Sequence, residues 1–377
     1  MHIGEFVLRN ARRMPDRAAL VWRNERFTWG DFNGRVNRLA DVLRRLGAGP
    51  GTAIASLLDN SNSFLELNFA AAKIGAILVP VMPRSVPREI AHVLKDVGAR
   101  IVVADSAARD ALSSIGESVG TLEAVITVAS GDASDIERLM HDAAADEPGI
   151  RVDEDSIGLI KYTSGTSGVP KGCARTHRQT ALAALLYVAH VPHLESDRAT
   201  ISSPLAAGFA ISLANAMALG GTTIHVLPKF EPRALLEAIE RERITLAYAI
   251  QSTFNSFTRH PDLDRFDLSS LRLFTGTSAT QDTLLGLQRL RRHPSFKGEF
   301  VNAYGSSEAG GYISYNMPED YERALAEPSL AQRVESIGRE AMLCRIECMD
   351  EKLSAMPGGE VGEMAIRAPT VDRKSVV

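Results

Sequence analysis

One stretch near the middle of the chain combines hydroxyls, glycines and a lysine at a spacing suited to binding phosphate. It follows an apolar run expected to be a buried strand, and it reads Lys161-Tyr162-Thr163-Ser164-Gly165-Thr166-Ser167-Gly168-Val169-Pro170-Lys171-Gly172. Glycines let backbone N–H groups converge on one point, hydroxyls add donors, and Lys171 adds a positive charge. The stretch therefore predicts a cradle for a polyphosphate. It is not a Walker P-loop, because Pro170 and Gly172 replace the glycine and hydroxyl residue of that motif. A flexible linker is the alternative.

Further short motifs follow and precede this stretch in a fixed order. They are Met14-Pro15-Asp16-Arg17-Ala18-Ala19-Leu20, Asn302-Ala303-Tyr304-Gly305-Ser306-Ser307-Glu308, Ser336-Ile337-Gly338-Arg339, Pro357-Gly358-Gly359-Glu360-Val361-Gly362-Glu363 and Arg367-Ala368-Pro369. With Tyr162–Gly172 they resemble the signatures of the adenylate-forming superfamily, which includes acyl-CoA and aryl-CoA synthetases, adenylation domains of peptide synthetases, and luciferases. Each motif alone is weak, but the ordered set covers nearly the whole chain and is specific to the superfamily.

The resemblance implies a ligase reaction in two steps. A carboxylate attacks the α-phosphorus of ATP to give an acyl-adenylate and pyrophosphate, and a thiol, usually coenzyme A, then takes the acyl group. ATP, Mg²⁺ and coenzyme A are thus the implied cofactors, and a carboxylic acid is the implied substrate. An anion must approach a tetra-anionic triphosphate, so donors and cations matter more than a general base. The residues implied around the β- and γ-phosphates are Thr163, Ser164, Gly165, Thr166, Ser167, Gly168 and Lys171, with Thr163 and Lys171 also catalytic.

The resemblance also assigns roles to the motif that ends at Glu308. Glu308 matches the magnesium ligand, and a single carboxylate with phosphate oxygens and waters is a usual way to hold Mg²⁺. Ser307 matches the hydroxyl at the α-phosphate, and Tyr304 matches the ring that stacks on adenine. A solvated glutamate and a core tyrosine are the alternatives for Glu308 and Tyr304. The other implied nucleotide-binding positions are Gly276, Thr277, Ser278, Gly305 and Ser306.

A segment of small residues corresponds to the family's acyl-binding wall. It is Ala206, Ala207, Gly208 and Phe209, where relatives often carry a bulky aromatic residue and a histidine before the glycine position. The alanines predict a wider substrate channel, although small residues could equally serve to pack a helix on a sheet. No Asp or Glu occurs from Ser202 to Leu219. An amino-acid substrate would need such a carboxylate for its ammonium group, so a simple aliphatic or aryl acid is favoured.

Alternating strand and helix patterns predict an α/β fold. A helix is expected over Thr28–Leu46, with strands near Ala53–Leu58 and Ile77–Val81, and the same alternation resumes after Asp153. We expect two packed α/β halves with mainly parallel sheets, over residues 1–150 and 151–335, and a small C-terminal β subdomain over 336–377. The resemblance implies the same fold, that of the N-terminal domain of an adenylate-forming enzyme.

The resemblance stops after Arg367-Ala368-Pro369. The family continues with a Thr-Gly-Asp element and a mobile domain that carries the adenylation lysine. We therefore expect this chain to lack its C-terminal domain and to be impaired as a CoA ligase. The alternatives are a catalytically impaired nucleotide- or acyl-binding module, an acyl-AMP ligase that delivers to another thiol, and a kinase or hydrolytic NTPase that uses the same loop.

Composition limits the partners and the compartment. A formal net charge of −4 over 377 residues gives no reason to expect nucleic acid. Three cysteines suit a reducing, cytoplasmic setting better than a disulfide framework. The longest apolar stretch, Ala181–Val191, is too short to span a bilayer. We expect no membrane span and leave open a homodimer.

Overall fold

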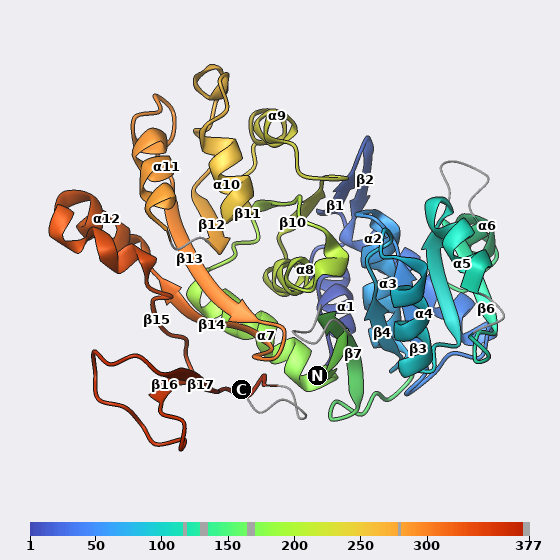
Figure 1. Ribbon diagram of the computed structural model, residues 1–377. Coiled ribbons are helices and arrows are strands. Elements are labelled where there is room, and N and C mark those ends of the chain that lie inside the picture. Colours follow the sequence, from blue (N-terminus) through green and yellow to red (C-terminus); the bar gives the residue numbers. More distant parts are fainter. Residues whose placement is uncertain (116–118, 129–134, 164–169, 278–279, 372–377) are drawn as a thin grey trace.

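The computed structural model describes residues 1–115, 119–128, 135–163, 170–277 and 280–371 (Figure 1). Two large sheets with flanking helices form the body of the molecule, and a short pair of strands near the C-terminus lies at its margin. Strands β3 to β6 of the smaller large sheet are the blue and cyan strands on the right of Figure 1, and strands β9 to β15 of the larger sheet are coloured green to orange.

The first large sheet has six strands in the order β6-β5-β3-β4-β7-β8. All neighbours are parallel except β7 and β8, which form an antiparallel hairpin at the sheet edge. The strands are β3 (Ala53–Leu57), β4 (Ile77–Pro80), β5 (Ile101–Asp105), β6 (Ala124–Val128), β7 (Ile157–Thr163) and β8 (Lys171–Thr176).

The second large sheet has nine strands in the order β15-β14-β13-β12-β11-β9-β10-β1-β2. Its middle strands are parallel, while β2, β14 and β15 add antiparallel pairs at the two edges. The strands are β1 (Ala18–Trp22), β2 (Glu25–Thr28), β9 (Arg198–Ile201), β10 (Thr223–Val226), β11 (Leu246–Ile250), β12 (Leu273–Thr277), β13 (Glu299–Ser306), β14 (Gly311–Asn316) and β15 (Arg339–Glu340). The separate pair is β16 (Arg345–Met349) with β17 (Glu363–Arg367).

Helices join most consecutive parallel strands. They are α1 (Gly4–Arg13), α2 (Trp29–Arg45), α3 (Asn62–Lys73), α4 (Pro87–Asp96), α5 (Arg109–Ile115), α6 (Asp135–His141), α7 (His177–His190), α8 (Phe209–Gly220), α9 (Pro232–Glu242), α10 (Gln251–Thr258), α11 (Gln281–Arg291) and α12 (Pro318–Ala326). Local sequence sets several of their starts. Thr28 and Asp31 form a capping box at α2, and Thr176 and Gln179 form another at α7.

One hydrophobic core joins the two halves. Leu78 and Ile101 of the six-stranded sheet belong to the same buried cluster as Ile201 and Ile224 of the nine-stranded sheet. Helix α3 is buried along its whole length, because it is covered on all sides rather than on one face. Two further clusters pack the outer helices on each sheet. The two halves are therefore held in a fixed relation by apolar burial, which is the dominant favourable term in folding.

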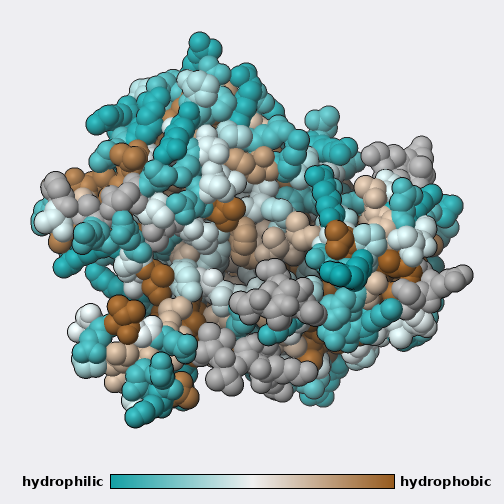
Figure 2. Space-filling model, viewed as in Figure 1, coloured by the Kyte–Doolittle hydropathy of each residue, from teal (hydrophilic) through white to brown (hydrophobic). Residues whose placement is uncertain are grey.

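The predicted fold class is confirmed: two packed α/β layers with mainly parallel sheets, and a small β pair near the C-terminus. The predicted division at residue 150 stays a prediction, and the sheets exchange strands across it. β1 and β2 join the nine-stranded sheet, whereas β7 and β8 join the six-stranded sheet. Figure 2 shows hydrophilic residues over most of the viewed face, with hydrophobic residues scattered among them. Within the described residues, no helix is long and apolar enough to cross a membrane.

Candidate active site

The predicted phosphate-binding stretch begins on β7 and ends at the start of β8, and these two strands pair antiparallel. Thr163 ends β7, Lys171 begins β8, and the two residues are paired across the hairpin. Thr163 is partly exposed and Lys171 is exposed, so both can meet a solvent-borne ligand. Ser164, Gly165, Thr166, Ser167 and Gly168 lie outside the described residues. The sequence analysis did not predict β8, and this strand is what returns the chain to α7.

The motif that ends at Glu308 forms the turn of a second hairpin. Tyr304, Gly305 and Ser306 are the last residues of β13, and Ser307 and Glu308 enter the turn before β14. A Cβ on Gly305 would lie 2.0 Å from the carbonyl oxygen of Gly311, so only glycine allows the two strands to approach this closely. Tyr304 is partly exposed, unlike residues 300–303, which precede it on β13 and are buried.

Arg175 connects the two hairpins. It lies on β8, is 1% exposed, and donates hydrogen bonds to the carbonyl oxygens of Ser307 and Gly310. Thr370 adds a third contact, because its hydroxyl donates to the carbonyl oxygen of Ala309 at 2.8 Å. The β7–β8 hairpin and the Glu308 turn are thus brought side by side, although they belong to different sheets. Neither Arg175 nor Thr370 was predicted from the sequence.

The predicted adenine loop lies at the end of β12, beside the second hairpin. Gly276 pairs with Ala249 of β11 on one side and with Asn302 of β13 on the other. A Cβ on Gly276 would come within 3.1 Å of the Phe300 ring, so a side chain would crowd the adjacent strand. Thr277 is partly exposed at the strand end, and Ser278 lies outside the described residues. Gly276, Thr277 and Tyr304 therefore lie near the carboxyl ends of neighbouring parallel strands.

The predicted substrate segment precedes α8 and lies against β7. Ala206 and Ala207 belong to a short 3₁₀ turn, Gly208 adopts a left-handed φ of 76°, and Phe209 begins α8. The Phe209 ring packs on Tyr248 with ring centroids 5.1 Å apart. The ammonium of Lys161 reaches this segment from β7, donating to the carbonyl of Gly208 and, at 3.1 Å, to the hydroxyl of Ser212.

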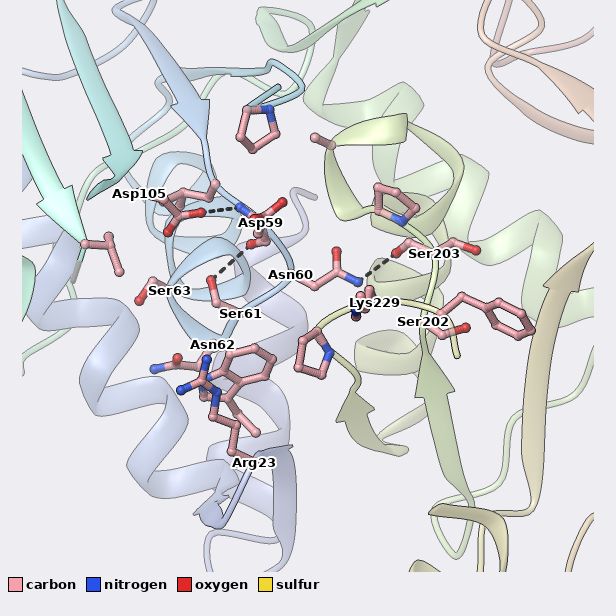
Figure 3. Close-up of a pocket in the computed structure, with 18 of the residues that line it drawn as sticks. Arg23, Asp59, Asn60, Ser61, Asn62, Ser63, Asp105, Ser202, Ser203 and Lys229 are labelled. Carbon is pink, nitrogen blue, oxygen red and sulfur yellow. Dashed lines mark hydrogen bonds between the residues drawn. The ribbon is translucent and has the colours of Figure 1, made fainter. Parts of the chain in front are cut away.

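A large cavity opens beside this segment, at the carboxyl ends of strands from both sheets (Figure 3). It has a volume of about 1060 Å³, and Ala206 of the predicted substrate segment forms part of its wall. Asn60 fixes one wall to the other, because its side-chain amide donates to the carbonyls of Ser203 and Leu227, each at 3.0 Å. Asp105 accepts the backbone N–H of Asp59 at 2.5 Å within the wall formed by the six-stranded sheet (Figure 3). Ligands of α/β proteins bind at this edge of the sheet.

Two buried basic side chains, Lys161 and Arg175, lie near the site. Burial, and secondarily the charge of Arg175, hold the pKa of Lys161 well below its ordinary value. Within the described residues, no three His, Cys, Asp or Glu side chains gather as a metal centre. Glu308 forms no hydrogen bond or ion pair with a described residue. A lone, unengaged carboxylate fits Mg²⁺ whose other ligands are phosphate oxygens and waters.

Comparison with known proteins gives consistent results. Residues 7–374 match the family described as AMP-binding enzyme. The chain is 29% identical over 372 residues to a feruloyl-CoA synthase of Amycolatopsis, covering 98% of this chain and 70% of that protein. It is 30% identical over 299 residues to the long-chain-fatty-acid–CoA ligase FadD13 of Mycobacterium tuberculosis, covering 78% of this chain and 58% of that protein.

Solved structures agree with this fold. The inhibitor-bound N-terminal domain of FACL13 from Mycobacterium tuberculosis superposes with a TM-score of 0.88 at 26% identity, covering 99% of this chain and 90% of that one. The anthranilate CoA ligase AuaEII, in complex with anthranoyl-AMP, shares the fold with a TM-score of 0.88 at 21% identity, covering 99% of this chain and 70% of that one.

Proposed function

This chain belongs to the AMP-binding enzyme family, and on that premise we propose that it is an ATP-dependent carboxylate–CoA ligase that acts through an acyl-adenylate. The observation that carries the proposal is the junction of the two hairpins at Arg175. Arg175 joins strand β8, which Lys171 begins, to the turn that carries the unengaged carboxylate of Glu308. The chain spans 58% to 70% of the length of the relatives above. An activity like theirs is therefore part of this proposal.

The first step joins the acid to the nucleotide. A carboxylate oxygen attacks the α-phosphorus, the bond to the β-phosphate oxygen breaks, and pyrophosphate leaves. Thr163 and Lys171 bind the β- and γ-phosphates and stabilise the charge that accumulates on the leaving group. Ser307 donates to the α-phosphate, and Tyr304 and Gly276 flank the adenine. Glu308 would hold Mg²⁺, which when bound neutralises phosphate charge.

The second step transfers the acyl group. The sulfur of coenzyme A attacks the acyl carbonyl, AMP leaves with one of the original carboxylate oxygens, and the thiol proton passes to solvent or to the leaving phosphate. The acyl chain occupies the wall formed by Ala206, Ala207, Gly208 and Phe209. This wall presents apolar surface and the Tyr248 ring behind Phe209, which suits an aliphatic or aryl acid.

Exchange of labelled pyrophosphate into ATP tests the proposal. The intact gene product is supplied with ATP, Mg²⁺ and a panel of aliphatic and aryl acids, and thioester formation with coenzyme A is followed by mass spectrometry. We expect exchange only when a suitable acid is present, and an acyl-CoA when the thiol is added. ATP loss without any acid would indicate a hydrolytic NTPase. ATP binding without exchange would indicate a binding module, and exchange without acyl-CoA would indicate delivery to another thiol.

A further inference from the structure

We propose that Arg175 is a positioning residue that holds the Glu308 turn against the phosphate-binding hairpin and so sets the affinity of the site for magnesium. The inference rests on the proposed function, because it takes Glu308 as the magnesium ligand. It adds a residue that no motif marks, and it concerns geometry rather than contact with substrate.

The first observation is how Arg175 reaches the turn. Its guanidinium is fully buried, and it donates from two different nitrogens to two carbonyls, those of Ser307 and Gly310. These carbonyls bracket Glu308. An arginine suits this task because its planar fork carries five fixed donors and stays charged at any physiological pH. Donation from a charged group to a buried carbonyl is worth more than a neutral hydrogen bond.

The second observation is how completely the turn is braced. Arg175 bonds the first and last carbonyls, Thr370 bonds the carbonyl of Ala309, and the N–H of Ala309 donates to the hydroxyl of Ser306 at 3.0 Å. The Glu308 carboxylate, in contrast, makes no bond with a described residue. A fixed backbone beneath a free carboxylate is the arrangement expected of a metal ligand, because preorganisation avoids an ordering cost when the ion binds.

The third observation is the location of Arg175 on β8. Lys171 begins this strand and Arg175 follows four residues later, and side chains at this even spacing lie on one face of a strand. Strand β8 is tied to β7 by a regular ladder from Leu159, the partner of Arg175, to Thr163, the partner of Lys171. Displacement of the Glu308 turn relative to the phosphates is therefore resisted by one rigid strand. Burial keeps Arg175 itself from touching the nucleotide, so its role is positioning rather than catalysis.

The test compares Arg175→Met and Arg175→Lys in the intact gene product. Pyrophosphate exchange is measured over a series of Mg²⁺ concentrations, and ATP binding is measured by calorimetry with and without Mg²⁺. We expect Arg175→Met to raise the half-saturating Mg²⁺ concentration about tenfold and to lower maximal exchange by up to about 10²-fold, as small misplacements do. ATP binding without Mg²⁺ should change little. Arg175→Lys keeps the charge but not the fork, and should give an intermediate value.

Arg272→Met is the matched control. Arg272 also donates to a backbone carbonyl, that of Pro192 at 2.6 Å, and pairs with Asp197, but it lies near the amino end of β12, away from the site. It should lower stability without changing the Mg²⁺ dependence. An unchanged Mg²⁺ dependence in folded Arg175→Met would overturn the proposal, and if that variant does not fold, an unchanged dependence in Arg175→Lys would do so.

If the proposed function is wrong, the same measurements give a different result. In that case the wild-type protein would show no acid-dependent exchange with any acid. The Mg²⁺ dependence of ATP binding by calorimetry would still decide on Arg175, because that measurement does not require turnover.

Discussion

Glu308 is the residue on which the proposed chemistry depends most. Replacement by glutamine keeps the size of the side chain but removes the charge that binds Mg²⁺. We expect Glu308→Gln to lower acid-dependent exchange by about 10²–10³-fold, the usual cost of losing one preorganised electrostatic group. Glu319→Gln is the control, since Glu319 is exposed on the helix that follows the hairpin. Exchange that is unchanged in Glu308→Gln would remove this residue from the metal role.

Lys161 presents the opposite situation, a buried cation that costs stability. Its burial depresses its pKa from an ordinary value of 10.5. In Lys161→Met the Gly208 carbonyl keeps the Ser212 hydroxyl as donor at 3.2 Å, so the lost ammonium leaves no unsatisfied carbonyl. Replacing a buried ion by an apolar group of similar size is often stabilising, here by about 1 kcal/mol. Urea unfolding measures the difference, with the exposed Lys95→Met as control.

The stability difference between Lys161→Met and the wild type should change with pH in a defined direction. Below pH 10.5 the unfolded state binds a proton at Lys161 more readily than the folded state does, so the wild type loses stability as pH falls. Lys161→Met has no ionisable group at this position and lacks this pH-dependent loss of stability. Its advantage over the wild type should therefore be larger at pH about 7.5 than at about 9.5. An advantage that grows with rising pH would show that the ammonium is stabilised, not destabilised, by its surroundings.

At the residue level, the sequence can single out candidate residues that a motif spaces, but not residues that only the fold brings together. Lys171 and Glu308 stand out because each follows a run of small residues. Arg175 resembles any polar residue of a short strand, and its partner Ser307 is 132 positions away. Thr370 is likewise separated from Ala309 by 61 positions. No local pattern encodes such contacts.

At the level of elements, the Glu308 hairpin needs glycine at Gly310 as well as at Gly305. Gly310 has φ +90°, and a Cβ there would lie 1.9 Å from the carbonyl oxygen of Thr370. The neighbouring Gly311 would meet nothing closer than 3.4 Å. We expect Gly310→Ala to destabilise the fold by about 1–3 kcal/mol and to weaken Mg²⁺-dependent ATP binding. Gly311→Ala should be nearly neutral in both thermal unfolding and calorimetry. Equal effects of the two substitutions would contradict the account of this turn.

The helix at Thr28–Leu46 was predicted more closely than strands at or next to the sheet edges, for a physical reason. The start of α2 is set by Thr28 and Asp31, three residues apart. Strands β8, β14 and β1 were not predicted, because a strand is defined by its partner. In β1, Leu20 pairs with Ile224, which lies 204 positions further along the chain. Such pairing gives no signal within a short window of sequence.

For the whole molecule, buried histidines predict a loss of stability in mild acid. Burial lowers the pKa of His177, His193 and His225 from 6.5 to about 4. These groups are neutral in the folded state but take up protons in the unfolded state below pH 6.5. Stability is therefore fully present above pH 6.5 and declines as pH falls towards 4. The midpoint of urea unfolding should fall across this range.

His225→Leu tests the source of that decline. His225 is buried on β10, with Glu242 at 4.0 Å and the arginines Arg26, Arg198 and Arg241 nearby. Removing the imidazole removes one proton-binding site from the unfolded state, so the acid-induced decline should become shallower. A decline of the same steepness in His225→Leu and the wild type would show that other groups cause the loss of stability in acid.

The central claim is that the carboxylate of the acid attacks the α-phosphorus of ATP. The most direct measurement uses an acid whose carboxylate oxygens are labelled with ¹⁸O, together with ATP, Mg²⁺, coenzyme A and the intact gene product. Mass spectrometry then locates the label after thioester formation. The account predicts one ¹⁸O in AMP for each acyl-CoA formed and none in pyrophosphate or phosphate. Label in inorganic phosphate, with ADP as the nucleotide product, would show attack at the γ-phosphorus and would contradict it.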